Sequence, residues 1–155
     1  MGEGWLRHDL GGDVEVHSAG TRPSFVHPRA TEVMAESGVD LSTHSSKSVE
    51  GLKDLPFDLV VTVCDSAREA CPVFPGAKKT VHNAFEDPAH AGTGDEALPV
   101  FRRLRNEIRD VLVPLVAREL GLRPGGPGRR IQPPGESGSS PAAPSSAAAG
   151  SPAAP

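Results

Sequence analysis

The segment Asp58-Leu-Val-Val-Thr-Val63, followed at once by Cys64, is the clearest structural signal in this sequence. It is an apolar run rich in β-branched residues, which is typical of a strand buried on both faces of a parallel sheet. In open α/β sheets, ligands bind at the carboxyl ends of the strands, and Cys64 stands at that position. The sequence therefore predicts an α/β protein with a site near Cys64.

Weaker patterns on either side of this run predict the other elements. Val14–Ala19 alternates apolar and polar residues and indicates a strand, and Lys79–Asn83 indicates a third, shorter strand. Helices are predicted over Pro28–Glu36, which ends at Gly38, and over a short piece from Val49 to Leu55. With a helix after the third strand, the predicted order is β-α-α-β-β-α.

The last helix is predicted to open with a capping box from Thr93 to Glu96. Apolar residues then follow at helical spacing: Leu98, Phe101, Leu104, Ile108, Val111, Leu112 and Leu115. Pro114 conflicts with this pattern, because an interior proline removes a backbone donor and costs roughly 3 kcal/mol. We expect a kink or an end there.

Composition limits the class of protein. The 155 residues carry a net charge of -4, which gives no electrostatic support for binding nucleic acid or membrane surfaces. Neither a signal peptide nor a membrane span is visible, so a cytoplasmic protein is predicted. Residues 1–122 are predicted to form one domain, whereas residues 123–155, rich in Pro, Ala, Ser and Gly, are predicted to be a disordered tail.

The two cysteines of the chain lie seven positions apart, in Cys64-Asp-Ser-Ala-Arg68-Glu-Ala-Cys71. Two packed, inert cysteines are one interpretation, because free cysteine is commonly buried. The short or polar residues between them, with Arg68 available to favour a thiolate, indicate reactive thiols instead. In a helix the two Cα atoms would be about 10 Å apart, whereas a disulfide needs about 4.4 to 6.8 Å. A redox-active pair would therefore require this stretch to unwind.

Asp87, in Phe85-Glu-Asp-Pro88, follows the third predicted strand and should lie at the same sheet edge as Cys64. It is either a turn residue before proline or a general acid, with Glu86 as the less favoured candidate for that role. The six histidines show no ligand spacing and no C-x-x-C pair exists, so neither zinc nor any other metal or cofactor is predicted.

Taken together, the sequence resembles the arsenate reductases that share the fold of low-molecular-weight protein tyrosine phosphatases. The matching stretches run from the N-terminus to about Leu120: Glu3–Trp5, Val16–Gly20, Pro28–Gly38, His44–Lys47, Phe57–Asp65, Ala67–Gly76, Phe85–Pro88 and Val100–Arg103 with Glu107-Ile108. The cysteine segment is the specific part, since plain phosphatases of this fold lack the pair. The resemblance implies a three-layer α/β/α fold with a four-stranded parallel sheet, whose first strand would precede Met1.

The resemblance also implies a relay of three thiols. A first cysteine, in a C-x5-R loop, would attack arsenate, Cys64 would attack that sulfur and release arsenite, and Cys71 would leave a Cys64–Cys71 disulfide for thioredoxin or a similar thiol reductant. Asp87 matches the general acid of the family. Residues 1–155 contain no C-x5-R loop, so this chain alone is expected to be inactive. A start site placed too late is the favoured explanation of the missing loop, and a true truncated remnant is the alternative.

Two other functions stay open at this point. A phosphatase of the same fold would use Asp87 but not the cysteine pair, and a non-catalytic remnant or interaction protein would need neither. Glu3 and Ser18 match positions associated with a monovalent cation in some relatives, but Lys47 stands where those relatives carry a carboxylate. No bound metal is predicted there.

Overall fold

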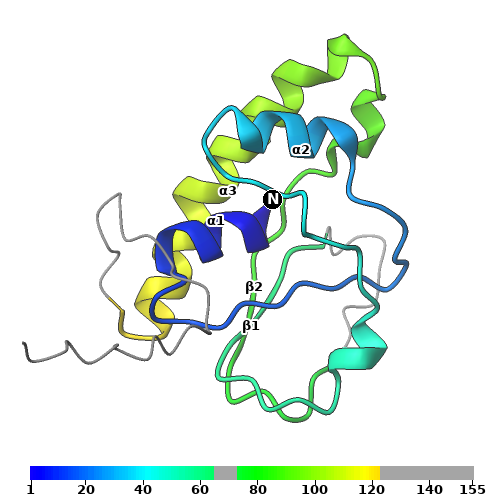
Figure 1. Cartoon of the computed structure of the whole chain (residues 1–155). Helices are drawn as coiled ribbons and strands as arrows, with labels where there is room; N and C mark the ends of the chain where they lie inside the picture. The colour runs from blue at the N-terminus through cyan, green and yellow to red at the C-terminus, as the bar shows by residue number, and fades with distance from the viewer. Residues whose placement is uncertain (65–72, 123–155) are drawn as a thin grey trace, which may run out of the picture.

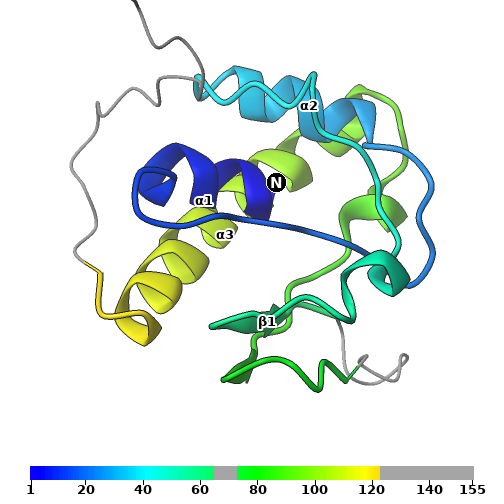
Figure 2. The ribbon, with the colours of Figure 1, turned by 60° about the horizontal axis from the view of Figure 1, so that its bottom comes forward.

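Three α-helices and a two-stranded parallel sheet form the regular structure of residues 1–64 and 73–122, the part of the chain that the computed structural model describes. Their order is seen in Figure 1, and Figure 2 shows the helices grouped on one side with the sheet on the other. The elements are α1 (Gly2–Leu10), α2 (Pro28–Ala35), the 3₁₀ turn η1 (Val49–Leu52), β1 (Val60–Thr62), β2 (Thr80–His82), the 3₁₀ turns η2 (Pro88–Ala91) and η3 (Asp95–Ala97), and α3 (Leu98–Glu119).

The sheet consists of β1 and β2, which pair in parallel with Val61 opposite Val81. The strands predicted over residues 58–63 and 79–83 are confirmed in place, although each is three residues long. The predicted sheet of four strands is not found in the described ranges, where the ladder has two. The α/β class is therefore confirmed, while the sheet of four strands, whose first strand was expected to precede Met1, stays a prediction.

The strand predicted over Val14–Ala19 is wrong for this structure. The segment keeps the alternating exposure of a strand, with Val14 and Val16 half-buried, but no ladder forms along it. Its one pairing is an isolated bridge between Gly20 and Ser48. A strand needs a neighbour for its backbone groups, and no neighbouring strand lies alongside it in the described part of the chain.

The prediction that the 58–63 run is buried on both faces is also wrong. All three residues of β1 are half-buried, and Val63 is 47% exposed. Leu59 and Val61 pack against the helical core, so one face of the strand is covered. Covering only one face explains the partial burial, because successive side chains point to opposite sides of a sheet.

The predicted helix at Pro28 is confirmed as α2. His27 caps it by accepting a hydrogen bond from the Arg29 N–H at 3.2 Å, and the chain turns at Gly38, whose φ of 78° suits glycine. The short helical piece predicted from Val49 to Leu55 is the 3₁₀ turn η1, which is shorter and capped by the Ser48 hydroxyl. Both helical segments predicted here are therefore confirmed in position.

Helix α1 was not predicted, and it packs closely on the turn that follows α2. A Cβ atom added at Gly4 would lie 2.8 Å from Leu41, 3.1 Å from Met34 and 3.2 Å from Val39. These three side chains are buried, so they have little room to yield. Gly4 therefore sets how near α1 can approach this turn.

Helix α3 does not end at Pro114 but continues to Glu119. Pro114 is exposed, whereas Leu112, Val113, Val116 and Ala117 around it are buried, and this packing offsets the lost backbone bond. The predicted capping box at Thr93 is wrong as well. No side-chain cap bond forms there, because the turn begins at Gly94, one residue later.

The apolar core falls into two clusters that share α3. The larger, between α1 and the second half of α3, consists of Trp5, Leu10, Met34, Val39, Leu41, Leu112, Val113, Val116 and Ala117. The smaller joins the start of α2 to the start of α3 and consists of Ala30, Val33, Ala97 and Phe101. The chain end of the described domain, Leu122, packs against the larger cluster, and the predicted tail from residue 123 lies outside the described residues.

Candidate active site

The carboxyl ends of β1 and β2 lie at the same edge of the sheet, because the strands are parallel. Cys64 follows β1 and Asp87 follows β2, as the sequence predicted. A backbone hydrogen bond of 3.3 Å from the Phe85 N–H to the Val63 carbonyl joins the two chain segments beyond the strands. The sheet thus brings Cys64 and the predicted general acid, Asp87, to one edge.

Cys64 is half-buried and is not a free thiol in this structure, since its sulfur is part of a disulfide. Because Cys64 follows β1 closely, the sheet fixes the position of its backbone. Cys71 and Arg68, predicted as the second thiol and as a group that favours a thiolate, lie outside the described residues. Their roles remain predictions.

Asp87 forms part of the wall of a cavity of about 280 Å³. The polar residues around this cavity are Glu3, Ser18, His27, His44, Ser45, Ser46 and Asp87, and its apolar wall includes Phe25, Val26, Leu41 and Phe101. Glu86 is engaged elsewhere, by Arg103 of α3 at 2.5 Å. Of the two acids that the sequence offered, Asp87 is therefore the one that borders the cavity.

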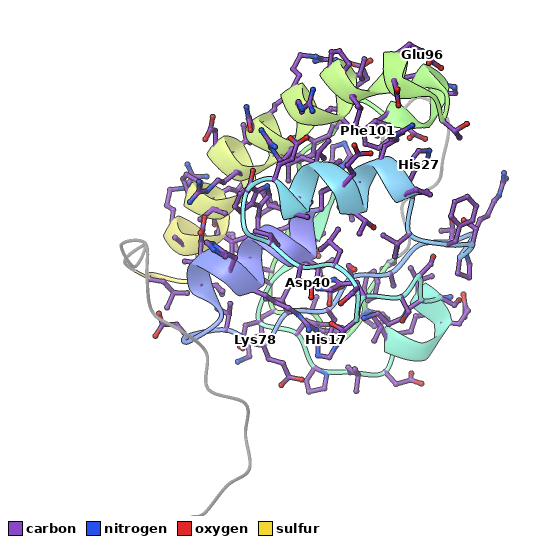
Figure 3. All side chains as sticks on the ribbon, turned by 45° about the horizontal axis from the view of Figure 1, so that its top comes forward. His17, His27, Asp40, Lys78, Glu96 and Phe101 are labelled. Atoms are coloured by element: carbon purple, nitrogen blue, oxygen red, sulfur yellow. The ribbon has the colours of Figure 1, made fainter. Side chains whose placement is uncertain are left out.

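His27 holds one side of the cavity through ring stacking. Its imidazole stacks on the buried Phe101 with ring centroids 4.7 Å apart and on the exposed Phe25 at 6.4 Å. Figure 3 places His27 and Phe101 together at the start of α2. Because His27 also caps α2, the same side chain fixes the helix start and the cavity wall.

One of the residues that line the cavity, Glu3, has a buried carboxylate. Glu3 is 7% exposed, accepts a hydrogen bond from the Ser18 hydroxyl and pairs with Arg7 at 2.7 Å. The Lys47 ammonium lies 3.6 Å from it and the His44 ring 3.8 Å. This cluster links α1 to the 14–20 and 41–48 segments. The resemblance had grouped Glu3, Ser18 and Lys47, whereas local sequence patterns did not, because the residues are far apart in the chain.

Charge and burial compete at this cluster. Burial raises the pKa of the Glu3 carboxyl, but the hydrogen bond from Ser18 and the charges of Arg7, Lys47 and His44 outweigh it, so the pKa lies below its ordinary value of 4.5. Burial lowers the pKa of His44, although Glu3 acts in the opposite direction. Glu3 is therefore an anion at neutral pH with cationic partners.

This arrangement predicts that Glu3→Gln destabilises the protein by about 1–3 kcal/mol at pH 7, because Arg7 and Lys47 lose their shared anion. A carboxyl whose pKa is lowered by folding stabilises the protein above its ordinary pKa, and that contribution disappears as the pH falls through the folded value. The difference in unfolding free energy between wild type and variant should therefore shrink below pH 4.5. Urea unfolding at several pH values measures it.

The control is Glu15→Gln, since Glu15 is 86% exposed and pairs only with His17 among the described contacts. It should change stability by less than about 0.5 kcal/mol. A Glu3→Gln deficit that stays constant from pH 7 to pH 3 would contradict the assigned charge of Glu3.

Comparison with known proteins identifies the family of this chain. The pattern of the family described as low molecular weight phosphotyrosine protein phosphatase matches residues 3–120. The chain belongs to this family. Its low-molecular-weight phosphatase-like α/β fold agrees with the two solved structures described next.

Several relatives in this phosphatase family carry one name. The chain is 43% identical to "Arsenate reductase" of Halalkalibacterium halodurans and 39% identical to "Arsenate reductase" of Bacillus subtilis, in each case over 70% of this chain and 78% of the relative. It superposes on "An arsenate reductase in the phosphate binding state" with a TM-score of 0.64 and 28% identity, and on "An arsenate reductase in reduced state" with 0.60 and 30%. Each match covers 76% of this chain and 86% of the solved chain.

Two further properties concern metals and membranes. Among the described residues, no group of three or more His, Cys, Asp or Glu side chains is arranged to hold a metal ion. Within the same ranges, none of the helices combines the length and the apolar character that crossing a membrane requires.

Proposed function

We propose that this member of the phosphatase family serves arsenate reduction through a relay of thiols. The observation that carries the proposal is Cys64, held at the carboxyl end of β1 as half of a disulfide, next to Val63, whose carbonyl accepts a hydrogen bond from the segment of Asp87. A phosphatase has no use for a thiol at this point. The named relatives, which are arsenate reductases, support the same assignment.

In the proposed relay, two thiols lose two electrons and form a disulfide, and arsenic gains those two electrons. A first thiolate adds to the arsenic of arsenate as water leaves, and Cys64 then attacks that sulfur, so that arsenic departs with the electron pair as arsenite. Cys71 next attacks Cys64, which frees the first thiol and leaves a Cys64–Cys71 disulfide. The first thiol belongs to a C-x5-R loop that residues 1–155 do not contain, so we propose that this stretch alone does not turn over.

Asp87 is the proposed general acid, which protonates the oxygen that leaves arsenic as water. In a chain lengthened upstream to include the first thiol, Asp87→Asn should lower arsenate turnover by about 10²- to 10⁴-fold. Glu86→Gln is the matched control, because Glu86 is held by Arg103 and should change the rate by less than about tenfold. Equal losses in the two variants would remove Asp87 from this role.

Arsenate-dependent oxidation of thioredoxin, followed through NADPH and thioredoxin reductase, tests the function itself. The lengthened chain should consume NADPH only when arsenate is present, and residues 1–155 should not. Turnover by residues 1–155 alone would refute the need for a first thiol elsewhere. We place this chemistry in the cytoplasm, where thiols are kept reduced.

Phosphatase activity is the second candidate, favoured by the description of the family. It would depend on the first thiol and Asp87 but not on Cys64. Hydrolysis of an aryl phosphate that survives Cys64→Ser unchanged, without arsenate turnover, would select it. If the lengthened chain shows neither activity, the body of residues 1–122 is better assigned as a binding domain, with residues 123–155 as a tether.

A further inference from the structure

One arginine at the start of α2 holds the loop that follows the proposed general acid. This loop runs from residue 88 to residue 97 and contains η2 and η3. The Arg29 guanidinium donates from Nε to the Thr93 carbonyl at 3.0 Å and from a terminal nitrogen to the Asp95 carboxylate at 2.8 Å. Figure 1 shows the loop, in green, beside the start of α2. Arg29 therefore ties the loop to the helix by two bonds.

The geometry of the arginine suits a fixed attachment. Its other terminal nitrogen donates to Glu32, further along α2, at 2.6 Å, so the side chain is also held on its own helix. The planar guanidinium keeps these three donors in a rigid fork. Gly92 and Gly94 flank Thr93 and give the loop backbone more freedom than other residues would. The bond from Arg29 thus restrains the part of the loop that has the most freedom to move.

Arg29 also connects two walls of the cavity beside Asp87. Its backbone N–H donates to the ring of His27, which lines the cavity together with Ala30 of α2. Asp87 and Pro88, at the start of the loop, line it from the other side. A shift of the loop against α2 would therefore change how the Asp87 carboxyl is set relative to the wall that α2 provides.

The remaining contacts fix only the two ends of this stretch. Ala97 is fully buried in the smaller core cluster, and Glu86, one residue before the acid, pairs with Arg103. The Glu86–Arg103 pair is more than half exposed on both sides, and such pairs hold weakly. Within the part of the chain that the structure describes, the polar contacts between the loop and α2 are those of Arg29. The loop depends on this residue for its place against the helix.

We propose that Arg29 is a positioning residue for the general acid: by holding Thr93 and Asp95 against α2, it sets how the Asp87 carboxyl faces the cavity. Proton transfer to the oxygen that leaves arsenic requires hydrogen-bond distance. A displacement of about 1 Å is enough to cost about 100-fold in rate. Arg29 acts through the loop, and the inference rests on the proposed function of Asp87.

The test compares arsenate turnover with thioredoxin in variants of the lengthened chain. Arg29→Gln should lower kcat by about 10- to 100-fold, while KM for arsenate stays within about twofold, because the effect falls on the proton transfer and not on binding. Arg29→Lys keeps the charge but loses the fork, so it should recover only part of the rate.

The matched control is Arg102→Gln. Arg102 joins α3 to Glu36, beyond the other end of α2, by two bonds of 3.0 and 2.6 Å, as Arg29 joins α2 to the loop. It touches no part of the loop among the described contacts, so kcat should change by less than about twofold. Asp95→Ala is a milder variant for the case in which Arg29→Gln unfolds, since the Asp95 side chain is 88% exposed. It should lower kcat by about two- to fivefold, because the bond to Thr93 remains.

A double variant separates positioning from a general loss of structure. In an Asp87→Asn chain, there is no proton left for Arg29 to position. Adding Arg29→Gln should therefore lower kcat by less than about a further twofold. A further loss as large as the one that Arg29→Gln causes alone would overturn the inference.

Hydrogen exchange in residues 1–155 gives a readout that needs no activity. Arg29→Gln should speed exchange of the η2 amides, which directly follow Asp87, by at least about fivefold, and Arg102→Gln should leave them within about twofold. Unchanged exchange of η2 in Arg29→Gln would overturn the inference whatever the chain catalyses.

The single variants distinguish failure of the inference from failure of the proposed function. If Asp87→Asn lowers turnover and Arg29→Gln does not, only the positioning is wrong. If Asp87→Asn keeps full turnover, the general acid and its positioning are both wrong. If the lengthened chain hydrolyses an aryl phosphate instead of reducing arsenate, the same comparisons apply, since that reaction would also use Asp87. A lengthened chain with neither activity would overturn both.

Discussion

Replacing Cys64 by serine should abolish reduction of the oxidised chain by thioredoxin. The chain has two cysteines, so the variant cannot form an internal disulfide. NADPH consumption with thioredoxin and its reductase should fall at least about 100-fold, to the level without the chain, because thiol–disulfide exchange needs an electrophilic sulfur. Cys71→Ser should have the same effect, although the attack on the sulfur of the first cysteine is proposed only for Cys64.

The matched control for this experiment is Thr62→Ser. Thr62 is in β1, two residues before Cys64, and its hydroxyl contacts the His82 ring across the ladder, a contact that serine preserves. Thioredoxin should reduce that variant at close to the wild-type rate. A wild-type chain that keeps both thiols free after mild oxidation would support instead the alternative of two packed, inert cysteines.

The elements that the sequence predicted well have strong local signals. The Pro28 helix has a proline at its first turn and a glycine at its end, and the β-branched run before Cys64 and the long periodic helix from Leu98 are equally plain. Cys64 and Asp87 were placed at one sheet edge because parallel strands put their carboxyl ends together. Local pattern and sheet geometry were sufficient for these features.

Long-range packing accounts for what the sequence did not predict. Helix α1 has a modest apolar pattern, but Glu3 in its first turn and Arg7 and His8 in its last suit the helix dipole and were an available signal. The Val14–Ala19 segment has the pattern of a strand, yet a pattern cannot supply a neighbour. The Glu3 cluster depends on residues from three separate segments, and no local rule brings them together.

Phe101→Ala should produce the largest loss of stability. Phe101 is 1% exposed, belongs to the smaller core cluster with Val33 and Ala97, and stacks on His27. Removing a buried phenyl ring loses its transfer energy and leaves a cavity, which costs about 3–5 kcal/mol. Since domains of this size are stable by about 5–15 kcal/mol, the variant should be close to unfolding at ordinary temperature.

The fluorescence of Trp5, the one tryptophan of the chain, reports this loss during urea unfolding. Trp5 is 2% exposed and belongs to the other core cluster, so its transition shifts with Phe101→Ala only if the two clusters unfold together. Val111→Ala, on the same helix but 38% exposed, is the control and should cost less than about 1 kcal/mol. A Phe101→Ala loss as small as that of the control would mean that the start of α3 opens independently of α1. The cavity beside Asp87 would then be bounded by a segment less stable than the core around Trp5, and Asp87 could not be held by the packing of Phe101.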